Sequence, residues 1–331
     1  MQTSAAGSTE SSTLDTLEGE LRIVTRKLVV GAFSPSVLLR VGRRLGLLDQ
    51  RGLDVLEKPV PSSPAQCRAL LDGELDATLT SPDNVIAYRF VPDNPLGETA
   101  DVTIVAAVDQ GLGLGVYARP GLSAGDLKGA NIGVDVPGSG FAFGLYALLE
   151  SLGLDRGDYQ IVTLGSTPRR LEALLAGDCD ATMLNAGNEL RAEDAGAVRL
   201  AGLTDVCHPY LGTVLSTVGD HRRAEVGALA GALREAAREV VAGNADELVV
   251  EEASAALRLP PALAVRYLER LKDPAEGLVA DGIVDPRAME TVLGLRRRYM
   301  PALVDGADVL ATALDPSRGL VDPHPYPTGG R

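Results

Sequence analysis

Short apolar runs alternate with longer segments in which apolar residues recur at helical spacing. The runs at 27–32 and 53–60 predict buried strands, and residues 35–45 between them predict a helix. A second helix that begins near Ser63 and a short strand at 77–80 complete a β-α-β-α-β unit. Strands that alternate with helices indicate a parallel α/β layer with right-handed crossovers.

This unit occurs twice. The segments ALLDGELDATLTSPDN at 69–84 and ALLAGDCDATMLNAGN at 173–188 are identical at eight of sixteen positions. Gly73 and Gly177 occupy equivalent positions and predict helix ends, because glycine adopts the left-handed conformation without a penalty. Upstream, Ser63-Pro64 and Thr167-Pro168 also match, and each predicts an N-cap followed by proline at the first helical position. Agreement in caps, strand and final asparagine predicts a duplicated lobe.

The remaining pattern predicts how the two units are connected. We expect the first part of lobe 1 at 21–118, with apolar strands at 102–108 and 112–118, and lobe 2 at 119–208. The glycine- and proline-containing stretch RPGLSAGDLKG, which begins at Arg119, predicts a linker between the lobes. Residues 209–314 predict a strand that returns to lobe 1 and then helices at 224–242, 245–257, 261–271 and 286–299. Two crossings between lobes would form a hinge.

The two ends of the chain are polar or irregular in composition. Residues 1–20 are rich in serine, threonine and glycine and predict a disordered N-terminus, and 315–331 predict an irregular tail. No basic and apolar leader, lipidated-cysteine signal or membrane-spanning run is evident in the sequence. As written, the sequence predicts a cytoplasmic protein, or a periplasmic or cell-surface one if a leader is missing.

The net charge of the chain limits the classes of molecule that it is expected to bind. The chain has 45 acidic and 31 basic residues, for a formal net charge of -14. Such a surface repels phosphate backbones and anionic membranes, so neither nucleic-acid binding nor membrane attachment is expected. The chain has no tryptophan, which removes a carbohydrate site built on stacked indole rings.

Several segments together resemble a known family. They are GLLDQRGLDVLEKPV and AQCRALLDGELDATLTSPDN in the first unit, and LSAGDLKGANIGV, PGSGFAFGLYALLESLGL and LEALLAGDCDATMLNAGN in the second. With the order of the elements, they resemble the type II periplasmic binding-protein fold. The chain looks most similar to the substrate-binding components of aliphatic sulfonate, nitrate, taurine and pyrimidine-precursor importers. The resemblance covers about 21–314 and specifies the fold better than the ligand.

That resemblance implies an α/β protein with two lobes. Each lobe would be a mostly parallel sheet flanked by helices, and a helical C-terminal extension would follow. The resemblance also implies that a small polar organic molecule binds between the lobes, that the hinge then closes, and that an ABC permease is a partner. We expect a monomer.

Ligands of parallel α/β sheets bind beyond the carboxyl ends of the strands. If both lobes turn those ends to one cleft, the loops that line it can be read from the sequence. In lobe 1 the expected ligand-binding residues are Phe33, Ser34, Ser36, Ser63, Ser81, Asp83 and Asn84. In lobe 2 and its exit they are Gly138, Ser139, Gly140, Phe141, Thr167, Asn185, Asn188 and His208.

The charge of the ligand stays open at this point. The segment Pro137-Gly138-Ser139-Gly140 could place the N–H groups of a helix start against an anion, but it also fits an ordinary serine-capped helix entry. Asp83 would repel an anion and could pair with an ammonium group. An Asx-turn after Pro82 is the interpretation that we favour for Asp83.

Little in the sequence predicts catalysis. The three histidines are His208, His221 and His324, and none lies in the first 207 residues. Cys67, Cys179 and Cys207 show no spacing typical of a metal site, so neither a metal nor a cofactor is expected. The resemblance includes two classes of enzyme. Aryl-sulfinate desulfinases of this fold place a cysteine where this chain has Ser34 and Ser36, and the pyrimidine synthases need a histidine in lobe 1 and a lysine for pyridoxal phosphate. Neither activity can be carried over to this chain.

Two hypotheses follow. The first is a solute-binding protein without catalytic activity. The alternative is an intracellular lyase, decarboxylase or desulfinase that uses Cys207, His208 and the cleft serines. We favour the first.

Overall fold

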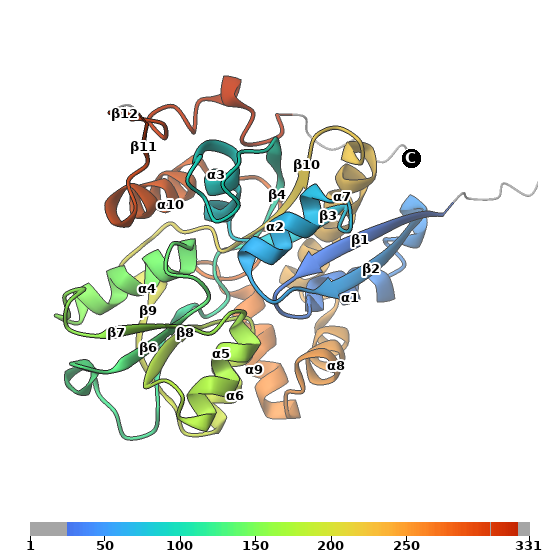
Figure 1. The fold of residues 1–331 in the computed structure, drawn as a ribbon. Helices are drawn as coiled ribbons and strands as arrows, with labels where there is room; N and C mark the ends of the chain where they lie inside the picture. The colour runs from blue at the N-terminus through green and yellow to red at the C-terminus, as the bar shows by residue number, and fades with distance from the viewer. Residues whose placement is uncertain (1–24, 305, 324–331) are drawn as a thin grey trace, which may run out of the picture.

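The computed structural model describes residues 25–304 and 306–323, which form two α/β lobes (Figure 1). The disordered N-terminus expected at 1–20 lies outside these residues, as do His324 and the end of the tail. Within the described ranges, no helix has both the length and the apolar character that a membrane span needs.

The first lobe contains a five-stranded sheet in the order β2-β1-β3-β10-β4. Its strands are β1 (Arg26–Ala32), β2 (Leu53–Pro59), β3 (Ala77–Thr80), β4 (Val102–Asp109) and β10 (Thr213–Val218). Strand β1 runs parallel to β2 and β3, whereas β10 is antiparallel to both of its neighbours. The sheet is therefore mostly parallel, as the β-α-β pattern predicted.

The second lobe repeats this arrangement in the order β7-β6-β8-β5-β9. Its strands are β5 (Gly115–Ala118), β6 (Asn131–Val134), β7 (Gln160–Thr163), β8 (Ala181–Leu184) and β9 (Val198–Gly202). Strand β6 is parallel to β7 and β8, and β5 is antiparallel to β8 and β9. Strand β5 therefore occupies the position that β10 occupies in the first sheet, and the two halves share one topology.

The placement of β5 corrects the expected division of the chain. Residues 112–118 were expected in lobe 1, but β5 belongs to the second sheet. The first crossing therefore lies at 110–114 and not at 118–119, and the segment after Arg119 connects strands of one lobe. An apolar run predicts a strand but carries no information about the sheet in which it pairs.

Three helices flank the strands of each lobe near the cleft. The first lobe has α1 (Val37–Arg44), α2 (Ser63–Leu71) and α3 (Pro82–Phe90), and the second has α4 (Gly140–Ser151), α5 (Thr167–Ala176) and α6 (Asn188–Asp194). Gly177 ends α5 with φ of 84°, and Gly73 follows α2 with φ of 73°, as expected.

The starts of two of these helices differ by one residue from the prediction. The N-caps of α2 and α5 are Ser62 and Ser166 rather than Ser63 and Thr167. The hydroxyl of Ser62 accepts the N–H of Ala65 at 3.4 Å, so Ser63 and Thr167 are the first helical residues and each proline is the second. Two adjacent hydroxyl residues leave the cap ambiguous in the sequence.

The C-terminal helices do more than extend the first lobe. They are α7 (Arg223–Val241), α8 (Asp246–Leu257), α9 (Pro261–Lys272) and α10 (Pro286–Tyr299). Helix α7 packs on the first sheet and on α1, and α8 packs on α1 and α9. Helix α9 also contacts α6 of the second lobe, and α10 contacts both α3 and α4 (Figure 1). Helices α9 and α10 therefore connect the lobes.

The segment after α10 returns to the first lobe. It contains the short hairpin β11 (Leu303–Val304) and β12 (Ala307–Asp308), followed by a 3-10 turn at Pro316–Arg318. Val321 then forms a bridge to Ile104 of β4. The described part of the tail, which was expected to be irregular, is thus attached to an edge strand.

Candidate functional site

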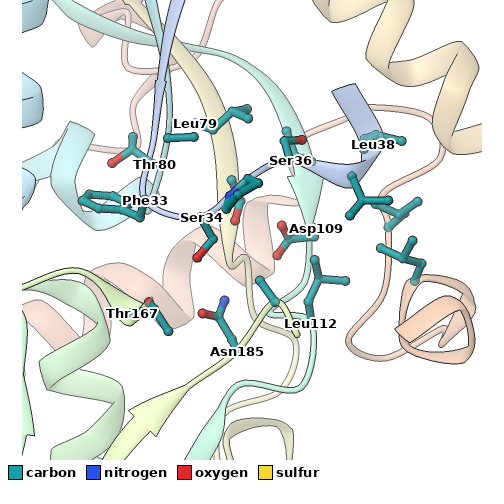
Figure 2. A pocket seen from close by; sticks show the side chains of 18 of the residues that line it. Phe33, Ser34, Ser36, Leu38, Leu79, Thr80, Asp109, Leu112, Thr167 and Asn185 are labelled. Atoms are coloured by element: carbon teal, nitrogen blue, oxygen red, sulfur yellow. The ribbon is translucent and has the colours of Figure 1, made fainter. Parts of the chain in front are cut away.

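A cleft lies between the lobes, where the strand-end loops of both meet (Figure 2). Its empty space of about 690 Å³ includes open solvent, and about 90 Å³ of it admits the centres of water-sized molecules, which is enough for a small ligand. In Figure 2, Ser34 and Asp109 border this space from the first lobe, and Thr167 and Asn185 border it from the second.

The first-lobe wall is the loop between β1 and α1. Phe33, Ser34 and Ser36 line the cleft in this loop, because the chain turns immediately after the parallel strand β1 ends at Ala32. The carboxylate of Glu57 accepts the backbone N–H of Ser36 at 2.6 Å, and the hydroxyl of Ser36 accepts the N–H of Leu39 at 3.2 Å. Burial raises the pKa of Glu57. The first contact attaches the loop to β2, and the second caps α1.

The second-lobe wall is formed by Phe141 and Thr167, at the starts of α4 and α5, and by Asn185 after β8. The side-chain amide of Asn185 donates to the carbonyl of Gly111 at 3.2 Å. Gly111 lies in the crossing segment between β4 and β5, so this hydrogen bond connects the second-lobe wall to the hinge.

Hydrogen bonds also join the lobes directly. The side chain of Asn188 donates to the hydroxyl of Ser34 at 3.3 Å. At another point, the backbone N–H of Ser166 donates to the carbonyl of Pro61 at 3.0 Å. These contacts connect the loop after β1 to α6 and the loop after β2 to the start of α5. The lobes are therefore in a closed arrangement around the cleft.

Asp109, the last residue of β4, places a buried carboxylate in the cleft wall. It accepts the N–H of Gly111 at 2.9 Å, and the hydroxyl and N–H of Thr213 also donate to it. Burial raises the pKa of Asp109 to about 6. Among the described residues that line this cleft there is no arginine, lysine or histidine.

A smaller compartment adjoins the cleft and shares the walls Phe33, Ser81, Phe141 and Thr167. It contains the buried pair Asp135 and Arg170. The hydroxyl of Ser139 donates to Asp135, and the Arg170 guanidinium donates to Thr167 Oγ1 at 3.0 Å and to the carbonyls of Gly165 and Met183 at 2.7 and 3.2 Å. Burial raises the pKa of Asp135 and lowers that of Arg170.

Comparisons with known proteins address the fold. No protein-family model matches the chain, and no curated protein matches its sequence. Solved structures do match. The alkanesulfonate-binding protein SsuA from Xanthomonas axonopodis pv. citri, bound to MOPS, is 20% identical with a TM-score of 0.63, over 81% of this chain and 90% of its own. The periplasmic nitrate-binding protein NrtA from Synechocystis PCC 6803 is 13% identical with a TM-score of 0.65, over 85% and 84%.

A third structure is a Candida albicans gene product described as exhibiting the generic periplasmic binding protein structural fold. It is 17% identical with a TM-score of 0.69, over 92% of this chain and 99% of its own. This chain has the type II periplasmic binding-protein fold. At these identities the likeness shows the fold alone, and the chemistry of the cleft must be argued from this chain's own residues.

Most of the predicted site residues do meet between the lobes of this periplasmic binding-protein fold. Those that line the main cleft are Phe33, Ser34, Ser36, Ser81, Phe141, Thr167 and Asn185. Asn84, Ser139 and Gly140 line the smaller compartment. Asn188 lines neither space but bonds to Ser34 beside the cleft. The strand-end rule thus predicted residues that line one cleft.

Other predicted residues lie elsewhere. Ser63 is buried inside the first lobe, in a small pocket with Tyr88. Gly138 faces the side chain of Met300, and its carbonyl accepts a hydrogen bond from Arg296 at 3.2 Å. Both residues follow strands, but Ser63 packs inside its own lobe and Gly138 lies against Met300 and Arg296.

Asp83 is a second correction. Its carboxylate forms a buried ion pair with Arg296, so it is neither available to a ligand ammonium group nor an Asx-turn acceptor; the hydroxyl of Ser81 accepts the N–H of Asp83 instead. A Cβ added to Gly140 would lie 2.4 Å from the Cβ of Asp83, which shows how closely α4 begins against α3. Ser139 caps α4 through the N–H of Ala142 at 3.2 Å, so its start is an ordinary helix entry.

The suggested catalytic pair does not reach the cleft. His208 is exposed and lines neither space, and Cys207 is buried, which raises the pKa of its thiol. Cys67 and Cys179 are buried too. The described residues contain no group of three or more potential metal ligands among His, Cys, Asp and Glu.

Asp109 and Tyr267 are cleft residues that the sequence analysis missed. Asp109 carried a usable signal, because it ends an apolar run in the way that Ser81 follows β3. Tyr267 carried none, since it lies in α9, which reaches the cleft only through tertiary packing.

Proposed function

We propose that this chain is a solute-binding protein that captures a small polar organic molecule between its lobes, as in ABC-type import. The observation that carries the proposal is that strand-end loops of both lobes wall one cleft while hydrogen bonds join the lobes beside it. A molecule that contacts both walls has more partners in the closed form than in the open one. Binding therefore shifts the hinge equilibrium towards closure.

The hinge is supplied by the two crossings, at 110–114 and at the segment between β9 and β10. Asn185 bonds to Gly111 in the first crossing, and Asp109 immediately precedes that crossing. Ligand contacts at Asn185 and Asp109 would therefore act directly on the hinge segment 110–114. This arrangement supports closure upon binding.

The proposal also specifies a protein partner and a location. Solute capture for import requires an ABC permease that distinguishes the closed form from the open one, and it places the protein in the periplasm or at the cell surface. We propose that the protein acts there as a monomer, because each monomer contains a complete cleft. The solved binding proteins for alkanesulfonate and nitrate support this role by their fold.

We propose further that the bound molecule is released unchanged. The cleft serines have no histidine, cysteine or lysine beside them among the described lining residues, so a nucleophile and its base are not brought together there. His208 and Cys207, the residues of the enzyme hypothesis, lie outside the cleft.

Native mass spectrometry of freshly purified protein is the test. We expect a retained small molecule, and we expect its re-addition to the stripped protein to give saturable heat in calorimetry and a smaller radius of gyration in X-ray scattering. Incubation should return the molecule unchanged. Failure of every compound, including the retained one, to compact the protein would refute the proposal, and a transformed product would establish an enzyme instead.

A further inference from the structure

We propose that the ligand of this cleft is a small organic ammonium compound whose charged nitrogen is bound by Asp109. This inference rests on the proposed function and specifies its substrate class. The proposed ligand is a cation, unlike the anions named for the alkanesulfonate- and nitrate-binding structures. It is argued below from the charges and donors around the cleft.

The fixed charge of the main cleft is negative. Asp109 is the one residue among the described lining residues with a formally charged side chain. In the adjoining compartment, Asp135 and Arg170 carry opposite charges and offset each other. An anion in the main cleft would have to approach a buried carboxylate in a medium of low dielectric constant, where like charges repel strongly.

Several of the donors that could hold an anion are already engaged. The backbone N–H groups of Ser36 and Leu39, at the start of α1, are bonded to Glu57 and to the Ser36 hydroxyl. The guanidinium of Arg170 donates to two carbonyls and to Thr167 within its own lobe. Arg170, the arginine beside the cleft among the described lining residues, is therefore held within its own lobe and is not free for the two-point pairing by which arginine binds carboxylates and sulfonates.

An ammonium group finds better partners. The carboxylate of Asp109 is held in place by Gly111 and Thr213 and retains lone pairs for further donors. The side-chain oxygens of Ser34 and Asn185 border the same space (Figure 2). One carboxylate and two neutral acceptors match the three donors of a primary ammonium group.

The rest of the wall describes the body of the ligand. Leu79, Val108, Leu112, Leu271 and Leu278 form apolar surface, and Phe33, Phe141 and Tyr267 contribute rings. Aromatic faces attract cations, and apolar walls favour a hydrocarbon portion. We therefore expect an amine with an aliphatic or aromatic body rather than a free ammonium ion.

The test compares amines with anions of similar size. Butylamine would be paired with butanesulfonate, and phenethylamine with phenylpropanoate, in calorimetric titrations of stripped wild-type protein at pH 7.5, together with the compound retained through purification. We expect the retained compound to be an amine and each probe amine to bind at least about tenfold more tightly than its anionic counterpart. Asp109→Asn should reduce the affinity for amines at least about tenfold and leave no preference for them.

Asp54→Asn is the matched control, because Asp54 is an exposed residue of β2 and the same charge is removed away from the cleft. It should leave the amine preference unchanged. If the anions bind more tightly and compact the protein, or if no amine preference is found, the inference is wrong while solute binding stands. The comparison of amines with anions on the wild-type protein tests the inference even if Asp109→Asn does not fold.

Discussion

The carboxylate of Asp83 and the guanidinium of Arg296 form a two-point ion pair across 213 residues of sequence, with N–O distances of 2.6 and 2.7 Å. Both side chains are buried, and the guanidinium also donates to the carbonyl of Gly138 at 3.2 Å. Asp83 lies in the first turn of α3 in the first lobe, whereas Gly138 precedes α4 in the second. Arg296 of α10 therefore joins both lobes through one buried side chain.

Asp83→Asn should destabilise the protein by about 3–5 kcal/mol, because it leaves the Arg296 charge buried without its counter-ion. Urea unfolding followed by circular dichroism measures the change. Glu74→Gln, which breaks the exposed pair of Glu74 with Lys58, should cost less than about 1 kcal/mol. Equal losses in the two variants would show that the buried pair has no special role.

The parts of the fold that local signals encode were predicted from the sequence. Residues 77–80 and 286–299 form the expected strand and helix, since apolar periodicity and a proline at the helix start report on nearby backbone. The strand-end rule brought Ser34 and Asn185 to one cleft for the same reason. Each signal lies within a few residues of the element that it predicts.

Long-range pairing was not predictable. Nothing near β5 specifies the second sheet, and nothing near Asp83 indicates a partner on α10. Tyr267 reached the cleft because α9 packs between the lobes. Each of these features depends on contacts between segments far apart in the chain, for which one sequence offers no pattern.

Gly165→Ala should weaken ligand binding by hindering closure. Gly165 has φ of 82°, and an added Cβ would lie 2.9 Å from the carbonyl of Pro61 in the opposite lobe. The open form has no such clash, so the substitution favours it. We expect the affinity for the retained ligand to fall about tenfold or more, and the radius of gyration with ligand to stay close to that of the free protein.

Gly153→Ala is the control for the backbone cost. Gly153 also has φ of 82°, but no atom lies within 4 Å of an added Cβ. Both variants should lose about 1–2 kcal/mol of stability, because alanine is strained in the left-handed region. Only Gly165→Ala should change ligand affinity; a similar loss in Gly153→Ala would attribute the effect to strain and not to closure.

Asp109→Asn should stabilise the ligand-free protein at neutral pH. Burial raises the pKa of Asp109 from 3.8 to about 6, so the folded state binds this proton more tightly than the unfolded state does. Its contribution to stability is complete below pH 3.8 and is lost as the pH rises through 6, by up to about 3 kcal/mol. The neighbouring phenols of Tyr210 and Tyr267 do not titrate in this range, since burial raises their pKa values.

Urea unfolding at pH 4 and at pH 7.5 tests this expectation. The variant should match the wild type at pH 4 and exceed it at pH 7.5, because asparagine does not ionise. A group that lowers stability at neutral pH is typical of a binding site, where its charge serves the ligand. The quantity to compare is the difference in unfolding free energy between the variant and the wild type. If this difference is no larger at pH 7.5 than at pH 4, burial does not disfavour the charged carboxylate of Asp109.

Glu189 should make the stability of the protein fall between pH 6 and pH 8. It lies in the first turn of α6, fully buried, with Oε2 accepting the N–H of Gly187 at 2.8 Å and Oε1 without a partner beside Gly113 of the first crossing. Burial raises its pKa from 4.5 to about 8, although Arg270 opposes the shift. Glu193 favours the neutral form as well.

Because the folded-state pKa is the higher one, the stabilisation is complete below pH 4.5 and is lost as the pH rises through 8. Glu189 should therefore lower the free energy of unfolding by up to about 1.4 kcal/mol per pH unit between pH 6 and 8, and Asp109, with a pKa of about 6, adds to this slope only in the lower part of the range. Glu189→Gln should remove most of that slope; the raised pKa of Asp135 can contribute the remainder. Glu247→Gln, at an exposed position of α8, should keep the wild-type slope, and identical slopes in all three proteins would show that Glu189 is already ionised at pH 6.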